Sequence, residues 1–487
     1  MLFEPLFTLA RQRPQDIAVL DDTGSHTYQQ LAAMAAGLGI YLASQTSRPH
    51  VGLLLPPCAA YVASFYGTLL AGKSVVPINY LLGDREIAHV IQDSAISTVI
   101  TVPQLAPRLK DASLKIIDLT QLPQTPPAIA PRLPSPHIDD MAVLMYTSGT
   151  AGLPKGVMLT YGNLQSDTDA CIEHANLQSN YTFIGVIPLF HSFGMTAMMI
   201  APLQLGAPIV YMNRFSPMGT LQAIRKHPVA VLLGVPSMFA AILRMESAKP
   251  EDFSQIYAAI SGGEPLPANL RTAWQQRFGQ PVFEGYGLTE TSPAVALNTP
   301  ASNRPGSVGK TLPGVQVRIV DDDGKPLSIG QAGEVWLKGP MIMKGYYNLP
   351  KETADALTAD GFFKTGDMGK MDPDGYLYIT GRKKDLIIIA GEKVVPREVE
   401  ELIVRHPAVA ECAVVPKKDS SRGEVVVAFI VPKTPDLNPD EIRAFCRDQG
   451  LPQFKIPREV YLIAELPRSP TGKVLKRELA AKANSET

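Results

Sequence analysis

The spacing of apolar residues alternates between two patterns along the first part of the chain. Residues 27–44 and 85–94 have the amphipathic spacing of helices, whereas residues 50–56, 96–101 and 114–119 are short apolar runs. A short apolar run bounded by turn residues is typical of a buried strand. Helical and strand patterns that alternate in this way predict a layered α/β domain.

The pattern changes at about residue 300 and again after Gly381. Short strand-like runs separated by Gly/Asp turns predict a small β-rich subdomain at about residues 300–380. After Gly381, the spacing predicts a helix over 396–407, then strands and a further helix that form a compact α+β unit. We therefore expect an N-terminal domain of residues 1–381 and a smaller C-terminal domain of residues 382–487.

Composition limits the classes of partner and compartment. The 487 residues include 45 Lys plus Arg and 46 Asp plus Glu, and a net charge of −1 argues against a nucleic-acid or membrane-surface footprint. The amino end lacks a signal-peptide pattern, and no uninterrupted apolar run is long enough to cross a bilayer. Four cysteines without paired spacing favour a reducing, cytoplasmic compartment over a disulfide framework or a zinc site: Cys58, Cys171, Cys412 and Cys446.

One segment, residues 146–160 (YTSGTAGLPKGVMLT), concentrates groups that bind anions. Its glycines leave the backbone free to present amide N–H groups, its hydroxyl side chains add donors, and Lys155 adds a mobile cation. The other members of this cluster are Thr147, Ser148, Gly149, Thr150, Gly152 and Gly156. A generic Gly/Ser/Thr turn is the alternative, but a strand that enters so dense a donor cluster favours a polyphosphate site.

The loop does not fit two common nucleotide-binding motifs. A Walker A loop has Lys followed by Ser or Thr and opens a helix, whereas Lys155 is followed by Gly156 and an apolar run. No G-x-G-x-x-G run follows an early strand, so a dinucleotide-binding dehydrogenase is also disfavoured.

Residues 146–156 resemble the phosphate loop of the adenylate-forming (ANL) superfamily, which includes acyl-CoA synthetases, nonribosomal-peptide adenylation domains and firefly-luciferase-like enzymes. Further matching motifs follow in the superfamily's order along nearly the whole chain: SGGEPLP (261–267), GYGLTE (285–290), TGD (365–367), GRKKDLIIIAGEKVVPREVE (381–400) and PTGKVLK (470–476). Ala151 stands where a second threonine is commoner, which leaves the loop amides unchanged. The resemblance implies a large N-terminal adenylation domain and a small mobile C-terminal domain.

The resemblance also implies roles for single residues in binding ATP. Tyr286 would stack on the adenine, Thr289 would contact the α-phosphate, and Glu290 would hold Mg²⁺ through hard oxygen ligands. The nucleotide-binding set then consists of the loop residues with Gly262, Gly263, Glu264, Tyr286, Gly287, Asp367 and Arg382. Outside this series of motifs, each of them would be interpreted as an ordinary turn or surface residue.

Lys473 carries the most specific expectation, because the matching lysine of the superfamily contacts both the attacking carboxylate and the α-phosphate. These two anions repel each other, and a cation between them is most effective in a site that excludes water. Lys384 matches the superfamily's domain hinge, and Gly391 and Lys393 match its thiol-binding segment. Without the resemblance, Lys473 would be interpreted as an exposed lysine.

The acyl pocket is expected between residues 187–207 and 232–243. The candidate lining residues are His191, Phe193, Met195, Gly234, Ser237 and Gly285. Amino-acid-activating relatives carry an aspartate where this chain has Phe190 and His191, so an amino-acid substrate is disfavoured. The apolar members could equally be ordinary core, and His191 orients the carboxylate, gates the pocket or is a structural histidine.

These observations predict an ATP-dependent acid–thiol ligase that most resembles the fatty-acid-CoA ligases and uses ATP, Mg²⁺ and coenzyme A or a phosphopantetheine thiol. A medium- or long-chain aliphatic acid is the favoured substrate, and an aromatic acid is its nearest competitor. The alternatives are a stand-alone adenylating enzyme that loads a separate acyl carrier protein, a non-catalytic nucleotide-binding relative, and a luciferase-like oxygenase.

Overall fold

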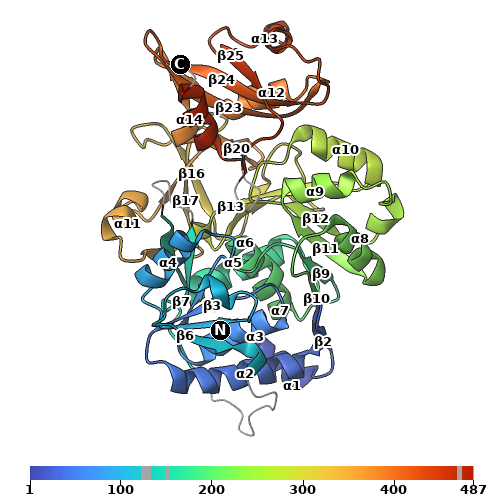
Figure 1. Cartoon of the computed structure of the whole chain (residues 1–487), viewed down its shortest axis with the longest axis vertical. Helices are drawn as coiled ribbons and strands as arrows, with labels where there is room; N and C mark the ends of the chain where they lie inside the picture. Colours follow the sequence, from blue (N-terminus) through green and yellow to red (C-terminus); the bar gives the residue numbers. More distant parts are fainter. Residues whose placement is uncertain (122–132, 148–152, 469–473, 486–487) are drawn as a thin grey trace. The chain divides into compact units, whose positions relative to one another are not determined.

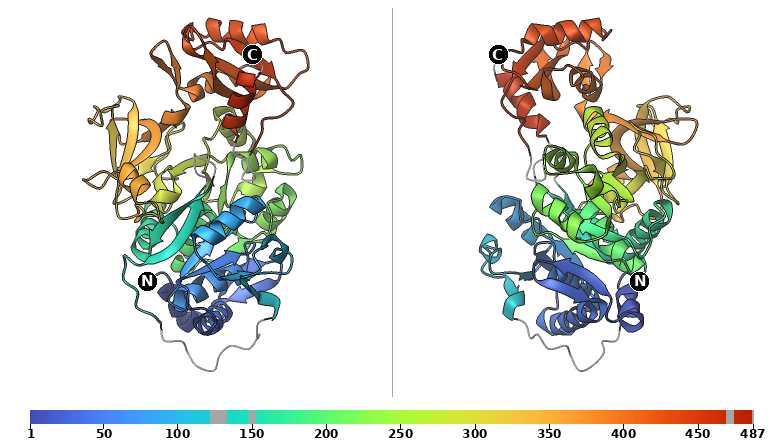
Figure 2. Two further views of the ribbon diagram at one scale, coloured as in Figure 1. Left: turned by 60° about the vertical axis from the view of Figure 1, so that its left-hand side comes forward. Right: turned by 90° about the vertical axis from the view of Figure 1, so that its right-hand side faces the viewer.

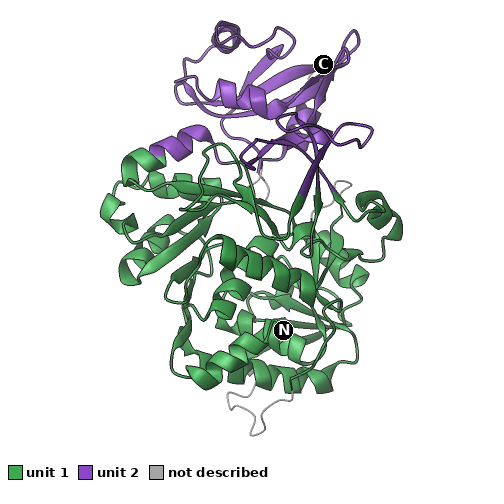
Figure 3. Ribbon diagram, turned by 180° about the vertical axis from the view of Figure 1, so that it is seen from behind, with its two compact units in different colours: residues 1–265, 274–316, 337–363 green, residues 266–273, 317–336, 364–487 purple. Residues whose placement is uncertain are grey.

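The computed structural model describes residues 1–121, 133–147, 153–468 and 474–485 (Figure 1). The chain divides into two compact units, coloured separately in Figure 3. Unit 1 consists of residues 1–265, 274–316 and 337–363, and unit 2 of residues 266–273, 317–336 and 364–487. The domain boundary at residue 381 stays a prediction.

A seven-stranded sheet lies in the N-terminal part of unit 1. Its order in the described part of the chain is β18 (Gly345–Tyr346), β8 (Lys155–Thr160), β7 (Met141–Thr147), β4 (Ser74–Pro77), β3 (His50–Leu54), β5 (Thr98–Thr101) and β6 (Lys115–Asp118). Strands β4, β3, β5 and β6 are parallel to their neighbours, whereas β7 and β8 form an antiparallel pair. The strands predicted at 50–56, 96–101 and 114–119 are confirmed.

The helices beside this sheet differ in how clearly the spacing of apolar residues predicts them. The predicted helices are present as α2 (Tyr28–Gln45) and α4 (Asp84–Asp93). A capping box starts α2, because Thr27 Oγ1 accepts the Gln30 N–H at 3.2 Å and the Gln30 side chain accepts the Thr27 N–H at 2.9 Å. In contrast, α3 (Ala59–Leu70) is apolar on nearly all sides and buried, so it lacks the periodic pattern of a surface helix.

A nine-stranded sheet forms the other large sheet of unit 1. Its order among the described residues is β15 (Lys310–Thr311), β14 (Ala294–Leu297), β13 (Val282–Gly287), β12 (Ala258–Ser261), β11 (Val229–Gly234), β9 (Thr182–Gly185), β10 (Ile209–Tyr211), β1 (Ile17–Asp21) and β2 (Gly24–Thr27). Strands β13, β12, β11 and β9 are parallel neighbours. In Figure 1, α8 (Pro217–Lys226) and α7 (Ala201–Leu205) lie on opposite sides of them. The loops that follow these strands therefore leave from one edge of the sheet.

The Met-rich segment after β9 is helical, with an interruption. It consists of α6 (Ser192–Met195), a π-helical stretch η3 (Thr196–Ile200) and α7. The Tyr211 hydroxyl donates to the Met198 carbonyl at 2.7 Å within this segment. π-Helical turns are frequent at functional sites, and this one follows directly on the predicted acyl-pocket residues.

The β-rich region predicted at about residues 300–380 is rich in strands, but they do not form one sheet. Its own four-stranded sheet has the order β16 (Gln316–Val320), β17 (Gly333–Lys338), β19 (Phe363–Met371) and β20 (Leu377–Arg382). Strands β15 and β18 come from the same region, but β15 belongs to the nine-stranded sheet and β18 to the seven-stranded sheet of unit 1. Sequence pattern identifies these strands, whereas their partners are set by tertiary packing.

The C-terminal part of unit 2 buries both faces of a strand pair, β23 (Val409–Asp419) and β24 (Gly423–Pro432). Ala413 and Val415 cluster with residues of α14 (Lys476–Ser485). Val414, with the opposite orientation along the strand, clusters with residues of α12 (Pro396–Ile403) and α13 (Pro439–Asp448). This α+β arrangement, visible in Figure 2, confirms the helix predicted at 396–407.

None of the helices in the described ranges has both the length and the apolar character needed to cross a bilayer. The four cysteines are free thiols, and Cys446 is buried.

Candidate active site

The predicted phosphate loop connects the two strands of an antiparallel hairpin. β7 and β8 pair so that Thr147 lies opposite Lys155. The loop residues Ser148, Gly149 and Thr150 lie outside the described residues, and their roles stay predictions. A strand rather than a helix follows the loop, which agrees with its departure from the Walker A motif. Lys155 therefore begins a strand whose backbone is held by its neighbours on both sides.

Tyr346 brings Lys155 and Glu290 together. The Lys155 Nζ atom lies 5.4 Å from the centroid of the Tyr346 ring, and the Tyr346 hydroxyl donates to Glu290 Oε1 at 2.9 Å. A cation above an aromatic face is attracted by the quadrupole of the ring. The predicted phosphate-binding ammonium and the predicted Mg²⁺-binding carboxylate thus contact the same side chain.

The backbone around Glu290 is tied to the same segment of chain. The Met343 N–H donates to the Glu290 carbonyl at 2.9 Å, and the Ser292 hydroxyl donates to the Met341 carbonyl at 2.8 Å. These bonds fix residues 340–346 against η5 (Thr289–Thr291). With Oε1 occupied by Tyr346, the second carboxylate oxygen of Glu290 is the hard ligand that Mg²⁺ prefers, so the residues present fit this ion.

Several of the predicted nucleotide-binding and acyl-pocket residues lie where the parallel strands of the nine-stranded sheet end. The Gly262 N–H donates to the Gly234 carbonyl at 3.1 Å, between the ends of β12 and β11. A Cβ atom on Gly262 would lie 3.1 Å from the Phe193 ring, so a side chain at Gly262 would crowd that ring. The residue types at this edge therefore allow an aromatic side chain to pack against the backbone beside the predicted adenine site.

The same edge carries the other predicted nucleotide residues and reveals a neighbour of Thr289. Tyr286 and Gly287 end β13, while Gly263 and Glu264 follow β12. The Ser192 and Thr289 hydroxyl oxygens are 3.3 Å apart, so the first residue of α6 is within hydrogen-bond distance of the predicted α-phosphate contact. This contact links the predicted acyl segment to the predicted phosphate site.

The predicted acyl-pocket residues lie in different environments. Met195 is fully buried, and Gly285 lies within β13. His191 precedes α6, and its Nδ1 accepts the Phe193 N–H at 3.3 Å, so it caps that helix. Ser237, near the start of α9 (Pro236–Leu243), is exposed. A structural role for His191 is therefore visible, and its role toward substrate stays a prediction.

Unit 2 brings Asp367 and Arg382 together. They face each other across the antiparallel pair β19–β20, with Arg382 Nε 3.1 Å from Asp367 Oδ1. The Asp367 side chain is only 4% exposed, whereas that of Arg382 is 49% exposed, so the guanidinium group also reaches solvent. These two predicted nucleotide-binding residues thus form one ion pair, and the arginine retains further N–H donors.

The predicted hinge and thiol-binding residues lie close together in the chain. Lys384 is exposed in η6 (Lys383–Asp385). Ala390 and Gly391 form the two-residue turn between β21 (Ile387–Ile389) and β22 (Glu392–Val394), and the φ angles of these two residues are +51° and +91°. A turn with two positive φ angles matches the twist of a tight hairpin. Lys393 forms an ion pair with Asp322.

Lys473 lies outside the described residues, whereas the described residues on either side of it form a β-bridge and ion pairs. Arg468 and Val474 form a β-bridge. Arg468 also pairs with Glu411 at 2.7 Å, and Lys476 pairs with Glu400 at 2.6 Å. The described residues Arg468 and Lys476 are therefore attached to strand β23 and helix α12, respectively.

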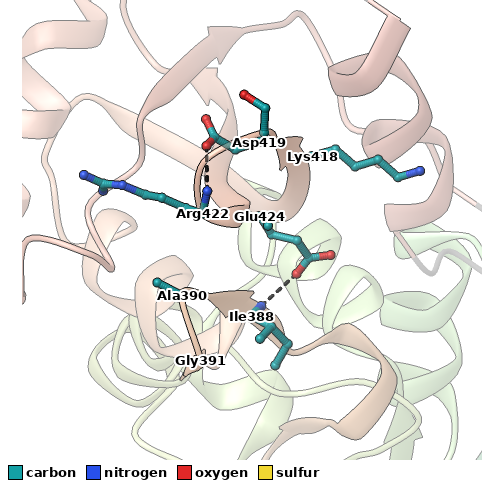
Figure 4. Close-up of a pocket in the computed structure, with 9 residues that line it drawn as sticks. Ile388, Ala390, Gly391, Lys418, Asp419, Arg422 and Glu424 are labelled. Atoms are coloured by element: carbon teal, nitrogen blue, oxygen red, sulfur yellow. Dashed lines mark hydrogen bonds between the residues drawn. The ribbon is translucent and has the colours of Figure 1, made fainter.

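A hollow of about 720 Å³ lies beside the β21–β22 turn (Figure 4). Its lining includes Ile388, Ala390 and Gly391 from that hairpin, together with residues 418–420 and 422–424 of the β23–β24 hairpin. The Glu424 carboxylate accepts the Ile388 N–H at 2.7 Å, while the Lys418 and Arg422 side chains extend to opposite sides (Figure 4). The hollow thus combines a fixed backbone wall with two cationic side chains near its rim.

Two residues of the site were not identified from the sequence. Tyr346 and Ser192 contact Glu290 and Thr289 across separations of 56 and 97 positions. Tyr346 lies in the apolar run GYY, and Ser192 lies in HSFG, a motif interpreted only for its acyl pocket. No local signal connects either residue with the nucleotide site.

The chain matches two families along most of its length. Residues 6–347 match the family described as AMP-binding enzyme, and residues 398–473 match the AMP-binding enzyme C-terminal domain. This chain therefore belongs to the AMP-binding enzyme family, and the resemblance to the adenylate-forming superfamily is confirmed, as is the predicted fold class.

Three relatives show how far the similarity extends. A long-chain-fatty-acid–CoA ligase of Bacillus subtilis is 35% identical over 480 residues, which cover 88% of this chain and 85% of that protein. A feruloyl-CoA synthase of Amycolatopsis sp is 34% identical over 479 residues, which cover 96% of each. The crystal structure of ATP-bound MatB from Rhodopseudomonas palustris aligns with a TM-score of 0.91 and 29% identity, over 99% of this chain and 98% of that one.

Proposed function

We propose that this protein is an AMP-forming acid–thiol ligase, which uses ATP to join a carboxylic acid to coenzyme A. The observation that carries the proposal is the contact of Lys155 and Glu290 with one tyrosine, Tyr346. The two curated relatives described above are named as CoA ligases or synthases, which supports the same reaction.

In the first step, a carboxylate oxygen of the acid attacks the α-phosphorus of ATP. The bond from this phosphorus to the bridging oxygen breaks, and pyrophosphate leaves with the electron pair. Lys155 binds the terminal phosphates, and the Thr289 hydroxyl, beside Ser192, contacts the α-phosphate. Glu290 would hold Mg²⁺, and the bound ion would offset phosphate charge. Lys473 would offset the repulsion between the two reacting anions.

In the second step, the thiolate sulfur of coenzyme A attacks the acyl carbonyl carbon, and AMP leaves with the carbon–oxygen bond electrons. Asp367 and Arg382 would hold the ribose, and Gly391 and Lys393 would contact the thiol-bearing arm. We infer a rotation of residues 382–487 about Lys384 between the steps, because the two steps need different groups at one carbonyl.

The acid is proposed to be a medium- or long-chain aliphatic carboxylate. Met195, Met198 and Met199 are fully buried in the helix after β9, and Phe190 packs edge-on to Tyr80 at 4.9 Å. Such a wall offers no partner for a substrate ammonium group. Because one relative is named feruloyl-CoA synthase, an aromatic acid is the competing substrate. The reaction would take place in the cytoplasm.

An acid panel tests the proposal. The protein is incubated with Mg·ATP and aliphatic acids of graded length, hydroxycinnamates or short polar acids, with coenzyme A, holo-carrier protein or no acceptor. We expect acid-dependent pyrophosphate release and CoA-dependent AMP release, strongest with an aliphatic acid. Absence of both products with every acid would refute the proposed reaction, and turnover with carrier protein alone would identify the stand-alone adenylating alternative.

The Lys473→Ala variant provides the internal control of this assay. Loss of the ammonium group should slow pyrophosphate release by about a hundredfold, as for other removed transition-state donors. Conversion of preformed acyl-adenylate to thioester should remain near the wild-type rate. Equal damage to both half-reactions would contradict the proposed role of Lys473.

A further inference from the structure

The contacts of Tyr346 single it out among residues to which no role has been assigned. Its hydroxyl donates to Glu290 Oε1 at 2.9 Å, and its ring carries the Lys155 ammonium at 5.4 Å from the centroid. Within the described ranges, Lys155 and Glu290 form no ion pair with each other, although both contact Tyr346. A direct pair would neutralise the two charges that the nucleotide site needs.

Tyr346 is held at its backbone and at its hydroxyl end. In β18 it lies opposite Val157 of β8, two positions from Lys155, and its N–H donates to Thr353 Oγ1 at 2.9 Å. The Met343 N–H bond to the Glu290 carbonyl joins the same segment to the carboxylate's own backbone. The orientation of the Tyr346 ring is therefore fixed, because hydrogen bonds hold both the backbone of this residue and its hydroxyl.

The hydroxyl is a donor rather than an anion at neutral pH. A tyrosine phenol carries its proton at neutral pH, and the 2.9 Å distance to Glu290 Oε1 shows where the proton is donated. The phenol consequently keeps its proton and orients the carboxylate without neutralising it. An arginine or lysine at this position would neutralise Glu290, and a phenylalanine would leave Oε1 without this donor.

We infer that Tyr346 is a positioning residue of the nucleotide site. Its hydroxyl fixes one oxygen of Glu290 so that the other is presented to the divalent cation, while its ring face holds Lys155 for the phosphates. This inference rests on the proposed function, since that function gives Glu290 and Lys155 their ligands. Partners that orient a metal ligand typically change metal affinity about 10- to 100-fold when removed.

Metal binding, rather than turnover, provides the test. Mn²⁺ serves as the probe, and its affinity in the presence of ATP is measured by electron paramagnetic resonance on the full-length protein. We expect Tyr346→Phe to weaken Mn²⁺ binding about tenfold. The Mg²⁺ concentration for half-maximal pyrophosphate release should rise by a similar factor, while thioester formation from preformed acyl-adenylate stays unchanged.

The neighbouring tyrosine is a matched control. Tyr347 is the next residue along the chain, and its ring packs edge-on to that of His50 at a centroid distance of 5.6 Å. Tyr347→Phe removes the same atom one position away and should leave the Mn²⁺ affinity unchanged. An equal loss of affinity in both variants, or no loss in Tyr346→Phe, would overturn the inference.

Two further variants separate the two functions of the ring. Tyr346→Leu also removes the aromatic face, so metal-free ATP should bind more weakly to it than to Tyr346→Phe. In a Glu290→Gln background, Tyr346→Phe should have no additional effect on Mn²⁺ binding, because the tyrosine acts through that carboxylate. Additive effects would refute this route. A wild-type protein that binds neither ATP nor Mn²⁺·ATP would instead refute the proposed function itself.

Discussion

At the scale of single residues, Asp167 is a buried acid that the proposed reaction does not use. It lies in α5 (Tyr161–His174), is fully buried, and accepts the Ala294 N–H at 3.0 Å through Oδ1. Its other oxygen, Oδ2, has no hydrogen-bond partner among the residues that the structure describes. Burial raises the pKa of Asp167 well above its ordinary value. The folded protein therefore keeps a proton here that the unfolded chain loses at about pH 4.

This proton makes the stability of the protein dependent on pH. As the pH rises above about 4, the unfolded state binds fewer protons than the folded state, so the free energy of unfolding falls. Asp167→Asn keeps the acceptor for Ala294 and cannot ionise. Its stability relative to wild type should increase with pH, with a slope of at most about 1.4 kcal/mol per pH unit, in urea unfolding series.

Asp169→Asn is the control, since Asp169 lies on the same helix and is exposed. Its stability relative to wild type should be nearly independent of pH above 4. A flat difference between Asp167→Asn and wild type over the same range would show that the carboxyl is ionised in the folded state.

Residue roles were predictable where a local motif carries them and not where distant segments meet. Lys155 and Glu290 lie in recognisable motifs, and the structure brings both into contact with Tyr346. Tyr346 and Ser192 reach the site through contacts between separate sheets and helices, which one sequence without tertiary packing does not specify. The roles of Asp367, Arg382 and Lys473 toward ligand stay predictions.

At the scale of elements, the turn Ala390–Gly391 offers a test of the predicted thiol-binding segment. Gly391 has a φ of +91°, where an L-side chain is strained by about 1–2 kcal/mol. A Cβ atom there would meet no neighbour within 4 Å, so strain rather than collision is expected. Gly391→Ala should slow thioester formation from preformed acyl-adenylate about tenfold, in rapid-quench assays, and leave pyrophosphate release intact.

Gly450→Ala is the matched control for this element. Gly450 has a φ of +79° after α13 and equally open surroundings, so the variant carries similar strain away from the β21–β22 turn. We expect both half-reactions of Gly450→Ala to be normal. If it slows the second step as much as Gly391→Ala does, general loosening of the domain is responsible.

Elements were predictable when one face was apolar and the other polar. This holds for α2 and α12, whereas strands β3, β5 and β6 were predicted as short apolar runs, and β3 and β5 are buried along their whole length. It fails for α3, which is buried on nearly all sides, so that its composition lacks periodicity. It also fails for the partners of β15 and β18, because two-residue strands contain too little pattern to specify a register.

At the scale of the whole molecule, ion pairs within unit 2 link the predicted C-terminal domain to the four-stranded sheet region. Lys383 lies 2.9 Å from Glu334 and 3.9 Å from Asp322, and Lys393 also pairs with Asp322. Lys383 precedes the predicted hinge, whereas Lys393 follows it. A rotation about Lys384 would therefore separate Lys393 from Asp322.

This arrangement predicts a salt effect on turnover. Added salt screens exposed pairs, so the second half-reaction of the wild type should accelerate with ionic strength. Asp322→Asn should be faster than wild type at low salt and should respond less to salt, in single-turnover assays. Asp323→Asn removes the same charge next door, where the partner is the local Lys325, and should keep the wild-type salt profile. If Asp322→Asn and wild type have identical salt profiles, the Lys393–Asp322 ion pair does not slow the second half-reaction.

The fold class and the reaction class were predictable because motifs from Thr147 to Lys473 follow a known order along the chain. The substrate was not, since residues predicted to line the acyl pocket, such as Met195, are buried apolar side chains whose arrangement depends on packing. The predicted boundary at residue 381 also stays open to experiment, because strand β20 ends only at Arg382.

The two apolar clusters around β23 and β24 draw all their members from residues 387–483. A polypeptide of the C-terminal residues alone would thus enclose its own hydrophobic interior and could be produced separately. If this polypeptide is mixed with the remainder of the chain, the approach of Lys473 to the nucleotide site becomes a bimolecular step, whereas in the intact chain it is intramolecular. The ratio of the two rates would give the effective concentration that tethering confers on Lys473.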